Sequence, residues 1–240
     1  MLDEDLARAL MSISTATLTT VLFKMGVRNV WIRGARALAP AQRRVVGPAF
    51  TLRFIPARED LSTPDAWKSP HSTRAAVEAM PAGSIAVIDS MRTPDAGVFG
   101  DILCARMRCR EVQGLVTDGV VRDLAGVKGS GLPVWCSGVA APPAVVQMTF
   151  VGWEEPVGCG GVAVFPGDYI VADEDGAIVI PKALVGNVIG TALEQEREED
   201  WILEKVKSGA ALPGLYPMNE ETRSRYETEL MRRRHPTEVS

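Results

Sequence analysis

The sequence predicts a layered domain of the α/β or α+β class, and three features of the chain support this prediction. Short apolar runs that suit buried strands are separated by turns rich in glycine and proline. From Gly83 onward, strand-like segments alternate with helix-like ones, which is typical of layered folds with helices outside a sheet. The chain has 240 residues, 46% of them hydrophobic and 23% charged, so it is long enough for one large domain or two small ones.

The N-terminal third predicts helices followed by a strand, a loop, a helix and a strand. Residues 4–26 place apolar side chains at helical spacing, and Gly26 supplies a C-terminal stop. The Ser- and Thr-rich stretch after Ser12 favours a break, or a second helix start, near Ser14. The elements expected next are, in chain order, a strand at Val45–Phe54, a polar surface loop at Arg58–Ser72 beside the site, a short helix at Thr73–Met80 and a strand at Ile85–Asp89.

The middle of the chain continues the alternation of strands and helices. Its expected elements are a helix at Ile102–Arg110, a buried strand at Gly114–Thr117, a turn at Asp118 and Gly119, a strand within Leu132–Ala140, strands at Val145–Trp153 and Gly161–Phe165, and a hairpin with arms at Tyr169–Ala172 and Ala177–Ile180. The acidic tip of this hairpin, residues 173–176, is interpreted as a solvated turn rather than a metal site.

The C-terminal part predicts a long helix at Lys182–Lys207, then an extended Pro- and Gly-rich segment and a polar terminal helix. We therefore expect a single domain over residues 1–207 and a C-terminal extension over residues 208–240. This extension has few apolar residues to bury against itself, so we expect it to pack on the domain or on a neighbouring subunit.

Composition excludes several classes of protein. The formal net charge is −4, and the one dense basic cluster, Met231–His235, is interpreted as a solvated chain end, so nucleic acid is not an expected partner. The N-terminus lacks the pattern of a signal peptide. No apolar run approaches the about 20 residues of a membrane span. A cytoplasmic location without membrane contact is the expectation.

Cysteine and histidine usage disfavours a zinc site. The only histidines are His71 and His235, and the cysteines, which lack zinc-binding spacing, are Cys104, Cys109, Cys136 and Cys159. Reduced thiols are the expected state in a cytoplasmic protein. A nucleophilic cysteine is disfavoured because Cys136 and Cys159 have no evident base nearby in the sequence.

The candidate chemistry lies between Gly97 and Gly126. Asp101 follows Gly100 at an expected helix start, and twenty residues separate it from the adjacent pair Arg122 and Asp123. An Asp before a helix and an Arg-Asp pair after the following strand predict one site at one edge of a sheet. Arginine suits bidentate capture of a carboxylate, and paired carboxylates suit a hard divalent cation such as Mg²⁺.

The D-x20-R-D spacing with the stretch TDGVVRD resembles the RraA-like proteins, which include divalent-metal-dependent 4-hydroxy-4-methyl-2-oxoglutarate aldolases. GPAFTLRF, GSIAVIDS, VFPGDYIVADEDGAIVIP and, more loosely, STATLTTVLFKMG match in the same order, so the resemblance covers roughly residues 10–200. It implies a swivelling β/β/α domain with a central β-sandwich-like core flanked by helices. It also implies a homotrimer or a homohexamer built as a dimer of trimers.

The resemblance implies a role for each candidate site residue. Asp123 would ligate Mg²⁺ or Mn²⁺, Asp101 would hold metal-bound waters, and Arg122 would contact the carboxylate and keto oxygens of a pyruvyl group. The substrate carboxylate would also meet backbone N–H groups near Ile102 and Leu103, after Gly100. A water activated by the metal would accept the proton of the C4 hydroxyl.

Several positions depart from the family pattern or stay open. Gly126 stands where many members carry an acidic residue, and Thr19 and Thr20 stand where an Asp is common. A glutamate of an adjacent subunit can approach the metal in family aldolases, and the candidates here lie within Glu194–Glu199. Asp118 is interpreted as a turn former, and Asp89 as either a turn former or a supporting residue. The arginines expected near the pocket, where they could read a second carboxylate or a polyhydroxyl tail, are Arg53, Arg58 and Arg74.

The leading hypothesis is a metal-dependent class II pyruvate aldolase that cleaves a 4-hydroxy-2-oxo acid, with oxaloacetate decarboxylation as a side activity. A Schiff-base mechanism is disfavoured because none of the six lysines lies in the middle of an expected strand. A dehydratase or tautomerase of a sugar-acid-derived 2-oxo acid is the nearest alternative. A non-catalytic regulator that binds a ribonuclease is the alternative from another class.

Overall fold

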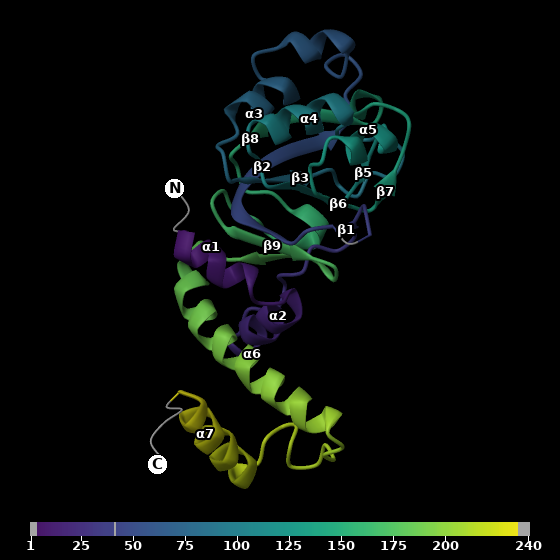
Figure 1. Cartoon of the computed structure of the whole chain (residues 1–240). Coiled ribbons are helices and arrows are strands. Elements are labelled where there is room, and N and C mark those ends of the chain that lie inside the picture. Colours follow the sequence, from purple (N-terminus) through teal and green to yellow (C-terminus); the bar gives the residue numbers. More distant parts are fainter. Residues whose placement is uncertain (1–3, 41, 235–240) are drawn as a thin grey trace. The chain divides into compact units, whose positions relative to one another are not determined.

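The computed structural model describes residues 4–40 and 42–234, which form two compact units (Figure 1). Unit 1 ends at Ile189 and unit 2 begins at Gly190, so the boundary falls inside helix α6 (Val185–Lys207). His235, the last residue of the predicted basic cluster, lies outside the described residues. The predicted division after residue 207 stays a prediction.

Unit 1 is built on an eight-stranded mixed sheet in the order β1-β6-β4-β3-β2-β9-β10, with β8 also paired to β2. Strands β2, β3, β4 and β6 are parallel neighbours, and the other pairings are antiparallel. The strands are β1 (Arg36–Ala37), β2 (Val45–Pro56), β3 (Ile85–Asp89), β4 (Gly114–Thr117), β6 (Val134–Cys136), β8 (Met148–Trp153), β9 (Tyr169–Asp173) and β10 (Gly176–Ile180), and β5 (Val120–Val121) pairs separately with β7 (Gly138–Val139). This mixed sheet with flanking helices confirms the predicted layered α/β class.

Strand β2 is the longest strand and connects three neighbours. Its first residues, Val45–Pro48, pair with β9, and Ala49–Arg53 pair in parallel with β3. Its last residues pair with β8, with an irregularity between Arg53 and Phe54. One strand therefore joins the parallel part of the sheet to the antiparallel strands β8 and β9.

The helices of unit 1 are α1 (Glu4–Met11), α2 (Thr15–Lys24), α3 (Thr73–Ala79), α4 (Asp101–Cys109) and α5 (Leu124–Gly129). The predicted break near Ser14 is confirmed, because the Ser14 side chain accepts a hydrogen bond from the backbone N–H of Thr17 (3.0 Å) and caps α2. No single helix among the described residues has the length and apolar character needed to cross a membrane. Asp5–Met11 of α1 and α2 meet these criteria only when the two helices are taken together, and the chain bends sharply between them.

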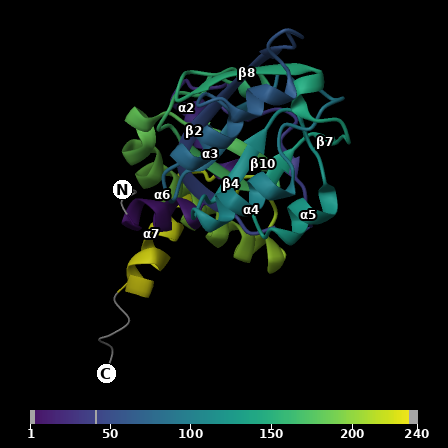
Figure 2. The same cartoon turned by 90° about the horizontal axis from the view of Figure 1, so that it is seen from above.

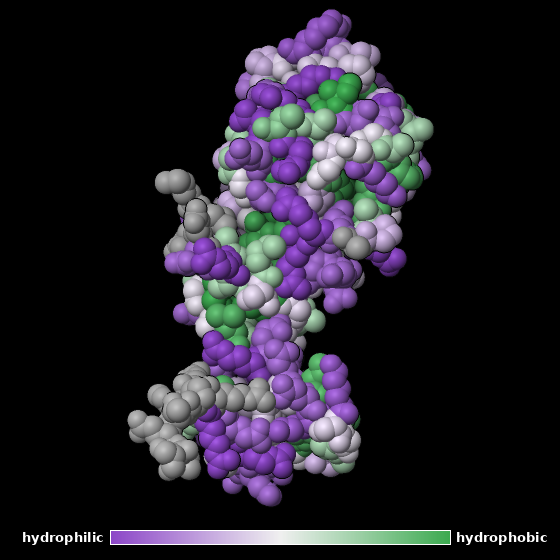
Figure 3. All heavy atoms as spheres, viewed as in Figure 1, coloured by the Kyte–Doolittle hydropathy of each residue, from purple (hydrophilic) through white to green (hydrophobic). Residues whose placement is uncertain are grey.

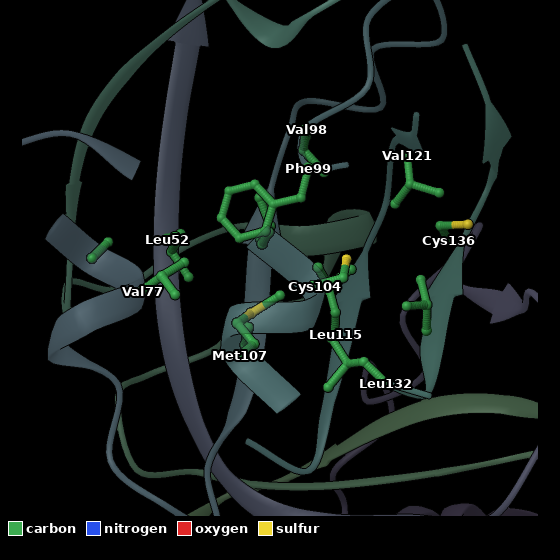
Figure 4. Close-up of a cluster of buried hydrophobic side chains, with 14 of the residues drawn as sticks. Leu52, Val77, Val98, Phe99, Cys104, Met107, Leu115, Val121, Leu132 and Cys136 are labelled. Carbon is green, nitrogen blue, oxygen red and sulfur yellow. The ribbon is translucent and has the colours of Figure 1, made fainter. Parts of the chain in front are cut away.

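Both faces of the parallel part of the sheet are buried, as its near-continuous apolar strands require. Alternate residues of β2 such as Phe50 and Leu52 join a core cluster beneath α3, α4 and α5, while Ala49 joins a second cluster on the opposite face. Figure 2 shows α3 and α4 over strands β2 and β4. In Figure 4, Phe99 and Val121 lie in the first cluster, which therefore supports the backbone on both sides of the candidate site.

Of two predictions about the segments after residue 157, one is wrong and the other is right only for Glu174 and Asp175, which are exposed. Gly161–Phe165 is not a strand: Gly160 and Gly161 adopt left-handed backbone angles (φ 59° and 78°), and Val164 forms only an isolated bridge with Val157. The acidic hairpin tip is not fully solvated, because Asp173 is buried. Its carboxylate accepts hydrogen bonds from the backbone N–H (2.9 Å) and hydroxyl (2.7 Å) of Thr15.

Unit 2 is a helical pair formed by α6 and α7 (Glu220–Arg234). Its core cluster contains Trp201, Ile202, Leu215 and Tyr226. Burial and a hydrogen bond to the Glu194 carboxylate raise the pKa of Tyr226 to about 12. Hydrophilic residues cover most of the visible face of this unit (Figure 3).

Candidate active site

Backbone hydrogen bonds bring the two halves of the D-x20-R-D pattern together. The segment before α4 lies parallel to β5: the N–H of Val98 donates to the carbonyl of Val120 (2.9 Å). The N–H of Arg122 in turn donates to the carbonyl of Phe99 (3.0 Å). Asp101, at the start of α4, and Asp123, directly before α5, therefore lie at the same edge of unit 1, beyond the carboxyl ends of β3 and β4. Ligands of open α/β sheets commonly bind at this edge.

Two glycines let each carboxylate approach the other helix. A Cβ atom at Gly100 would lie 2.7 Å from Asp123 Oδ2. A Cβ atom at Gly126 would lie 2.5 Å from Asp101 Cβ and 2.8 Å from Asp101 Oδ2. Asp123 thus lies against the N-terminal end of α4, and Asp101 lies against α5. An acidic side chain at position 126, expected from the family pattern, has no room in this arrangement.

The side chains of the Arg-Asp pair are bonded to each other and accessible to solvent. Arg122 Nε donates to Asp123 Oδ2 at 3.1 Å, and the two side chains are 35% and 46% exposed. Asp123 adopts a left-handed backbone conformation (φ 55°, ψ 51°), which is uncommon outside glycine and is concentrated at functional sites. Asp101 Oδ1 accepts a hydrogen bond from the N–H of Ile102 at 2.7 Å. The amide predicted to receive a substrate carboxylate is therefore paired with Asp101 in this structure.

A cavity of about 470 Å³ begins at these residues. Its near end is lined by residues 97–103 together with Arg122 and Asp123, so every predicted site residue borders it. The rest of its lining, which we call the far end, comes from the segment around Trp67 and Arg74 and from Phe54 and Phe150 of β2 and β8. Such a volume is typical of small-molecule sites.

Other predicted polar residues lie away from the cavity. Asp118 is buried and joins three segments, because it accepts hydrogen bonds from the N–H (3.0 Å) and hydroxyl (2.7 Å) of Ser90 and from the N–H of Gly160 (3.0 Å). Asp89 accepts bonds from the amides of Met91 (3.0 Å) and Gly158 (3.1 Å). Both carboxylates hold loops together and do not border the cavity.

Of the three arginines predicted to lie near the pocket, one borders the cavity. Arg74 lines the cavity. Arg53 and Arg58 are not part of its lining, and they lie close to Glu155 (3.9 Å) and Asp60 (2.9 Å), respectively. Side chains alternate between the two faces of β2, so Arg53 and the cavity-lining Phe54 point to opposite faces. Arg58 is held by its pair with Asp60. The sequence alone did not reveal either arrangement.

Comparison with known proteins identifies a family whose matched segment contains these residues. The model of the RraA-like family, described as Aldolase/RraA, matches residues 15–179, which is more than half of the chain. This chain belongs to the RraA-like family. The match includes all the candidate site residues and ends within β10.

The relatives of this RraA-like protein carry different names. Protein DlpA of Legionella pneumophila is 26% identical over 210 residues, 87% of this chain but 32% of DlpA, so the chain spans about a third of that protein's length. A Halalkalibacterium halodurans protein named "Putative 4-hydroxy-4-methyl-2-oxoglutarate aldolase" is 32% identical over 158 residues, 65% of this chain and 69% of that protein.

Two solved structures share the fold of this RraA-like protein. A protein from Pseudomonas syringae pv. tomato superposes with a TM-score of 0.79 at 25% identity, covering 91% of this chain and 95% of that one. Streptomyces coelicolor RraAS2, described as an unusual member of the RNase ES inhibitor RraA protein family, superposes with a TM-score of 0.75 at 32% identity, covering 83% and 96%. The relatives of this RraA-like protein thus include one with an enzyme name and one described as a member of an inhibitor family.

The donor atoms at this RraA-like site fit a hard divalent cation. Among the described residues, no three His, Cys, Asp or Glu side chains gather as a full set of metal ligands. Asp101 and Asp123 nevertheless direct two carboxylates to the space between α4 and α5. Mg²⁺ is commonly bound by one or two protein carboxylates, with water and substrate oxygens in the other positions. Asp123, the more open of the pair, is the residue that would hold it.

Neither thiols nor lysines offer a competing reactive group in the cavity. Burial raises the pKa of the Cys104 thiol to about 12 and raises the pKa values of Cys136 and Cys159 as well, so these thiols stay protonated at neutral pH. None of the six lysines lies in a strand or borders the cavity.

The residues that the sequence did not reveal form the far wall of the cavity. Phe54 and Phe150 pack edge to face, with ring centroids 5.2 Å apart, because β2 and β8 are paired. Trp67 and His71 come from the polar loop that was expected beside the site, so only their neighbourhood could be predicted. Aromatic residues within an otherwise polar loop were the one available signal.

Proposed function

We propose that this RraA-like protein is a divalent-metal-dependent class II pyruvate aldolase that cleaves a 4-hydroxy-2-oxo acid and also decarboxylates oxaloacetate. The observation that carries the proposal is the meeting of Asp101, Arg122 and Asp123 at the near end of the cavity. The aldolase name of the Halalkalibacterium relative supports the same reaction class.

In this proposal the C3–C4 bond breaks, the electron pair moves to C3 and is delocalised onto the 2-keto oxygen, and the C4 hydroxyl loses its proton. Arg122 binds the 1-carboxylate and faces the keto oxygen, where its positive charge opposes the charge that develops. A divalent cation, when held by Asp123, supplies Lewis acidity to the same oxygens. C3 then takes up a proton to give pyruvate.

Asp101 and the first turn of α4 have supporting roles in this proposal. The Asp101 carboxylate positions the water that accepts the C4 hydroxyl proton. The first N–H groups of a helix lack partners within the helix, so Leu103, in the first turn of α4 and at the cavity wall, suits contact with an anionic substrate. The N–H of Ile102 can also contact the substrate once its hydrogen bond to the Asp101 carboxylate is broken. Decarboxylation of oxaloacetate places the same charge on the keto oxygen and therefore needs the same groups.

The experiment measures pyruvate release from oxaloacetate with Mg²⁺, with Mn²⁺ and after EDTA treatment, corrected for decay caused by metal alone. We expect turnover that requires metal in the wild type and falls by at least about 100-fold in Asp123→Asn and Arg122→Gln, because each change removes transition-state charge stabilisation. Asp175→Asn, an exposed change at the hairpin tip, is the matched control. Metal-independent turnover, or full activity in both site variants, would refute the proposal.

A second function is favoured by one observation, the structural match to RraAS2 and its description as a member of an RNase inhibitor family. A protein that acts by binding a ribonuclease has no need of the Asp123 carboxylate. The test measures capture of a purified ribonuclease by the wild type and by Asp123→Asn. Equal affinity of the two proteins, together with no oxaloacetate turnover, would favour the regulator. Metal-dependent turnover without capture would favour the enzyme. A dehydratase or tautomerase, by contrast, would consume a 2-oxo sugar acid without releasing pyruvate.

A further inference from the structure

The far end of the cavity offers a wall of aromatic and aliphatic side chains. Phe54 and Phe150 meet edge to face there, and Trp153 stacks against the Phe150 ring with centroids 6.3 Å apart. Leu61 and Val151 line the same end and are 51% and 46% exposed, although both side chains are apolar. Accessible apolar surface inside a concavity is typical of a site for an apolar ligand. This wall therefore favours a hydrophobic ligand group.

Several hydroxyl groups at the far end already have partners within the protein. Ser62 and Thr149 are hydrogen-bonded to each other through their hydroxyls, and Thr149 also accepts a hydrogen bond from the N–H of Arg58 (2.9 Å). The Ser72 hydroxyl accepts a hydrogen bond from the N–H of Ala75 (3.3 Å) and so caps α3. A polyhydroxyl ligand needs a partner for each hydroxyl that leaves water. The far end thus suits a polyhydroxyl group less well than a hydrophobic one.

Arg74 also borders the far end, but it lines a second, adjoining hollow as well. That hollow is shared with Trp67, Glu78 and Arg106. Glu78 lies four residues after Arg74 in α3, so the two side chains share one face of the helix. The Arg74 guanidinium stacks on Trp67, with its central carbon 4.9 Å from the ring centroid. Arg74 therefore does not require an anion in the cavity, and its stack with Trp67 adds a flat surface to the far end.

We propose that the far end binds an aromatic ring carried on C4 of the substrate, so that this protein cleaves 4-aryl-4-hydroxy-2-oxobutanoates. This inference rests on the proposed aldolase function and names its substrate class. Aromatic rings prefer edge-to-face and offset contacts with other rings, and the aromatic wall formed by Phe54, Phe150 and Trp67 offers such contacts. A cavity of about 470 Å³ has room for the ring beside the pyruvyl group at Arg122.

The reaction leaves the aromatic ring unchanged. The C3–C4 bond breaks, and its electron pair moves to C3. The C4 hydroxyl loses its proton and becomes the carbonyl of an aromatic aldehyde, while C3 takes up a proton to give pyruvate. Arg122 thus holds one product, and the aromatic wall holds the other.

The first measurement compares the affinities of three 2-oxo acids that lack the C4 hydroxyl and are therefore not cleaved. They are 2-oxo-4-phenylbutanoate, 2-oxopentanoate and 2-oxoglutarate, which carry a phenyl, a methyl and a carboxylate group on C4. Calorimetric titration in the presence of Mg²⁺ gives the Kd of each compound. We expect the phenyl compound to bind about 10- to 100-fold more tightly than 2-oxopentanoate, because its ring leaves water, and also more tightly than 2-oxoglutarate.

Two variants test whether the residues of the far end cause this preference. Phe150→Ala should weaken binding of the phenyl compound by about 10-fold and binding of 2-oxopentanoate by less than about 3-fold. Leu61→Ser, at an exposed position where the substitution leaves the core intact, should weaken binding of the phenyl compound by about 3-fold or more. Leu212→Ser is the matched control, because Leu212 is 53% exposed and does not line the cavity, and it should bind all three compounds as the wild type does.

The second measurement is the release of pyruvate and benzaldehyde from 4-hydroxy-2-oxo-4-phenylbutanoate, alongside metal-dependent turnover of oxaloacetate, which has no ring. Release of both products, with a phenyl preference that falls in Leu61→Ser, supports the inference. Three results overturn it while intact oxaloacetate turnover leaves the proposed function standing: no benzaldehyde release, tighter binding of 2-oxoglutarate, or a phenyl preference unchanged in Leu61→Ser. Absence of metal-dependent oxaloacetate turnover in the wild type overturns the proposed function and this inference with it.

Discussion

Replacing Gly126 by alanine tests the close contact between α4 and α5 at the site. A Cβ atom at position 126 would lie 2.5 Å from Asp101 Cβ, where ordinary contact begins at 3.4 Å. The two carbons must therefore separate by about 0.9 Å. Rotation of the Asp101 side chain cannot relieve a contact with its own Cβ, so the backbone of one helix has to move.

The displacement is expected to cost activity more than stability. Overpacking costs about 1–3 kcal/mol, while Gly→Ala in a helix gains about 1 kcal/mol, so the net loss of stability is about 0–2 kcal/mol. For a chain of this length that corresponds to a fall in Tm of at most about 8 °C. A shift of about 1 Å in a catalytic group can lower the rate by about 100-fold.

The assay pairs thermal unfolding with metal-dependent pyruvate release from oxaloacetate. Gly129→Ala is the matched control, because position 129 lies in the same helix and a Cβ atom there meets nothing within 4 Å. We expect Gly129→Ala to keep full activity and to be as stable as the wild type or more so. Full activity in Gly126→Ala, with a Tm equal to that of Gly129→Ala, would refute the close packing of Asp101 on α5.

Three further predictions concern stability and reactivity. Asp173→Ala should lower the free energy of unfolding in urea by about 3 kcal/mol, because it removes a buried acceptor of several hydrogen bonds, while Asp175→Ala at the exposed tip should change it by less than about 0.5 kcal/mol. The pKa of Tyr226 is about 12 when folded and about 10 when unfolded, so the unfolded chain loses the proton first and stability falls as pH rises from about 10 to 12. Urea titrations at about pH 9 and about pH 11 measure this loss of stability, and Tyr226→Phe should show a smaller loss between the two pH values than the wild type. Iodoacetamide should alkylate the exposed Cys109 alone in the folded protein and all four thiols in denaturant, and rapid modification of a second thiol in the native state would contradict the burial of the other three.

The parts of the fold that depend on local sequence were predictable. The strands Ile85–Asp89 and Gly114–Thr117 have the predicted bounds, and the Ser14 cap divides α1 from α2 as expected. The approach of Asp101 to Arg122 and Asp123 was predictable as well, because a strand, a helix and a further strand return the chain to the same edge of a sheet.

The features that depend on distant contacts were not predictable. Asp173 is buried because Thr15, 158 positions away, caps its carboxylate, and nothing in the acidic tip itself signals this. Gly160 and Gly161 turn an apolar run into a loop through their backbone angles. The aromatic wall exists only because β8 pairs with the end of β2, which brings Phe150 beside its partner ring.

The attachment of the segment around Trp67 has a consequence for how this molecule can change over evolution. Its start is joined to β8 by a few hydrogen bonds, among them one from the N–H of Arg58 to the hydroxyl of Thr149 (2.9 Å), whereas Asp101 and Asp123 are fixed by contacts between α4 and α5. Insertions and substitutions in this surface segment can therefore reshape the far end of the cavity without moving the carboxylates. The two ends of the cavity are free to diverge at different rates, and relatives with the same Arg-Asp pair need not share a ligand.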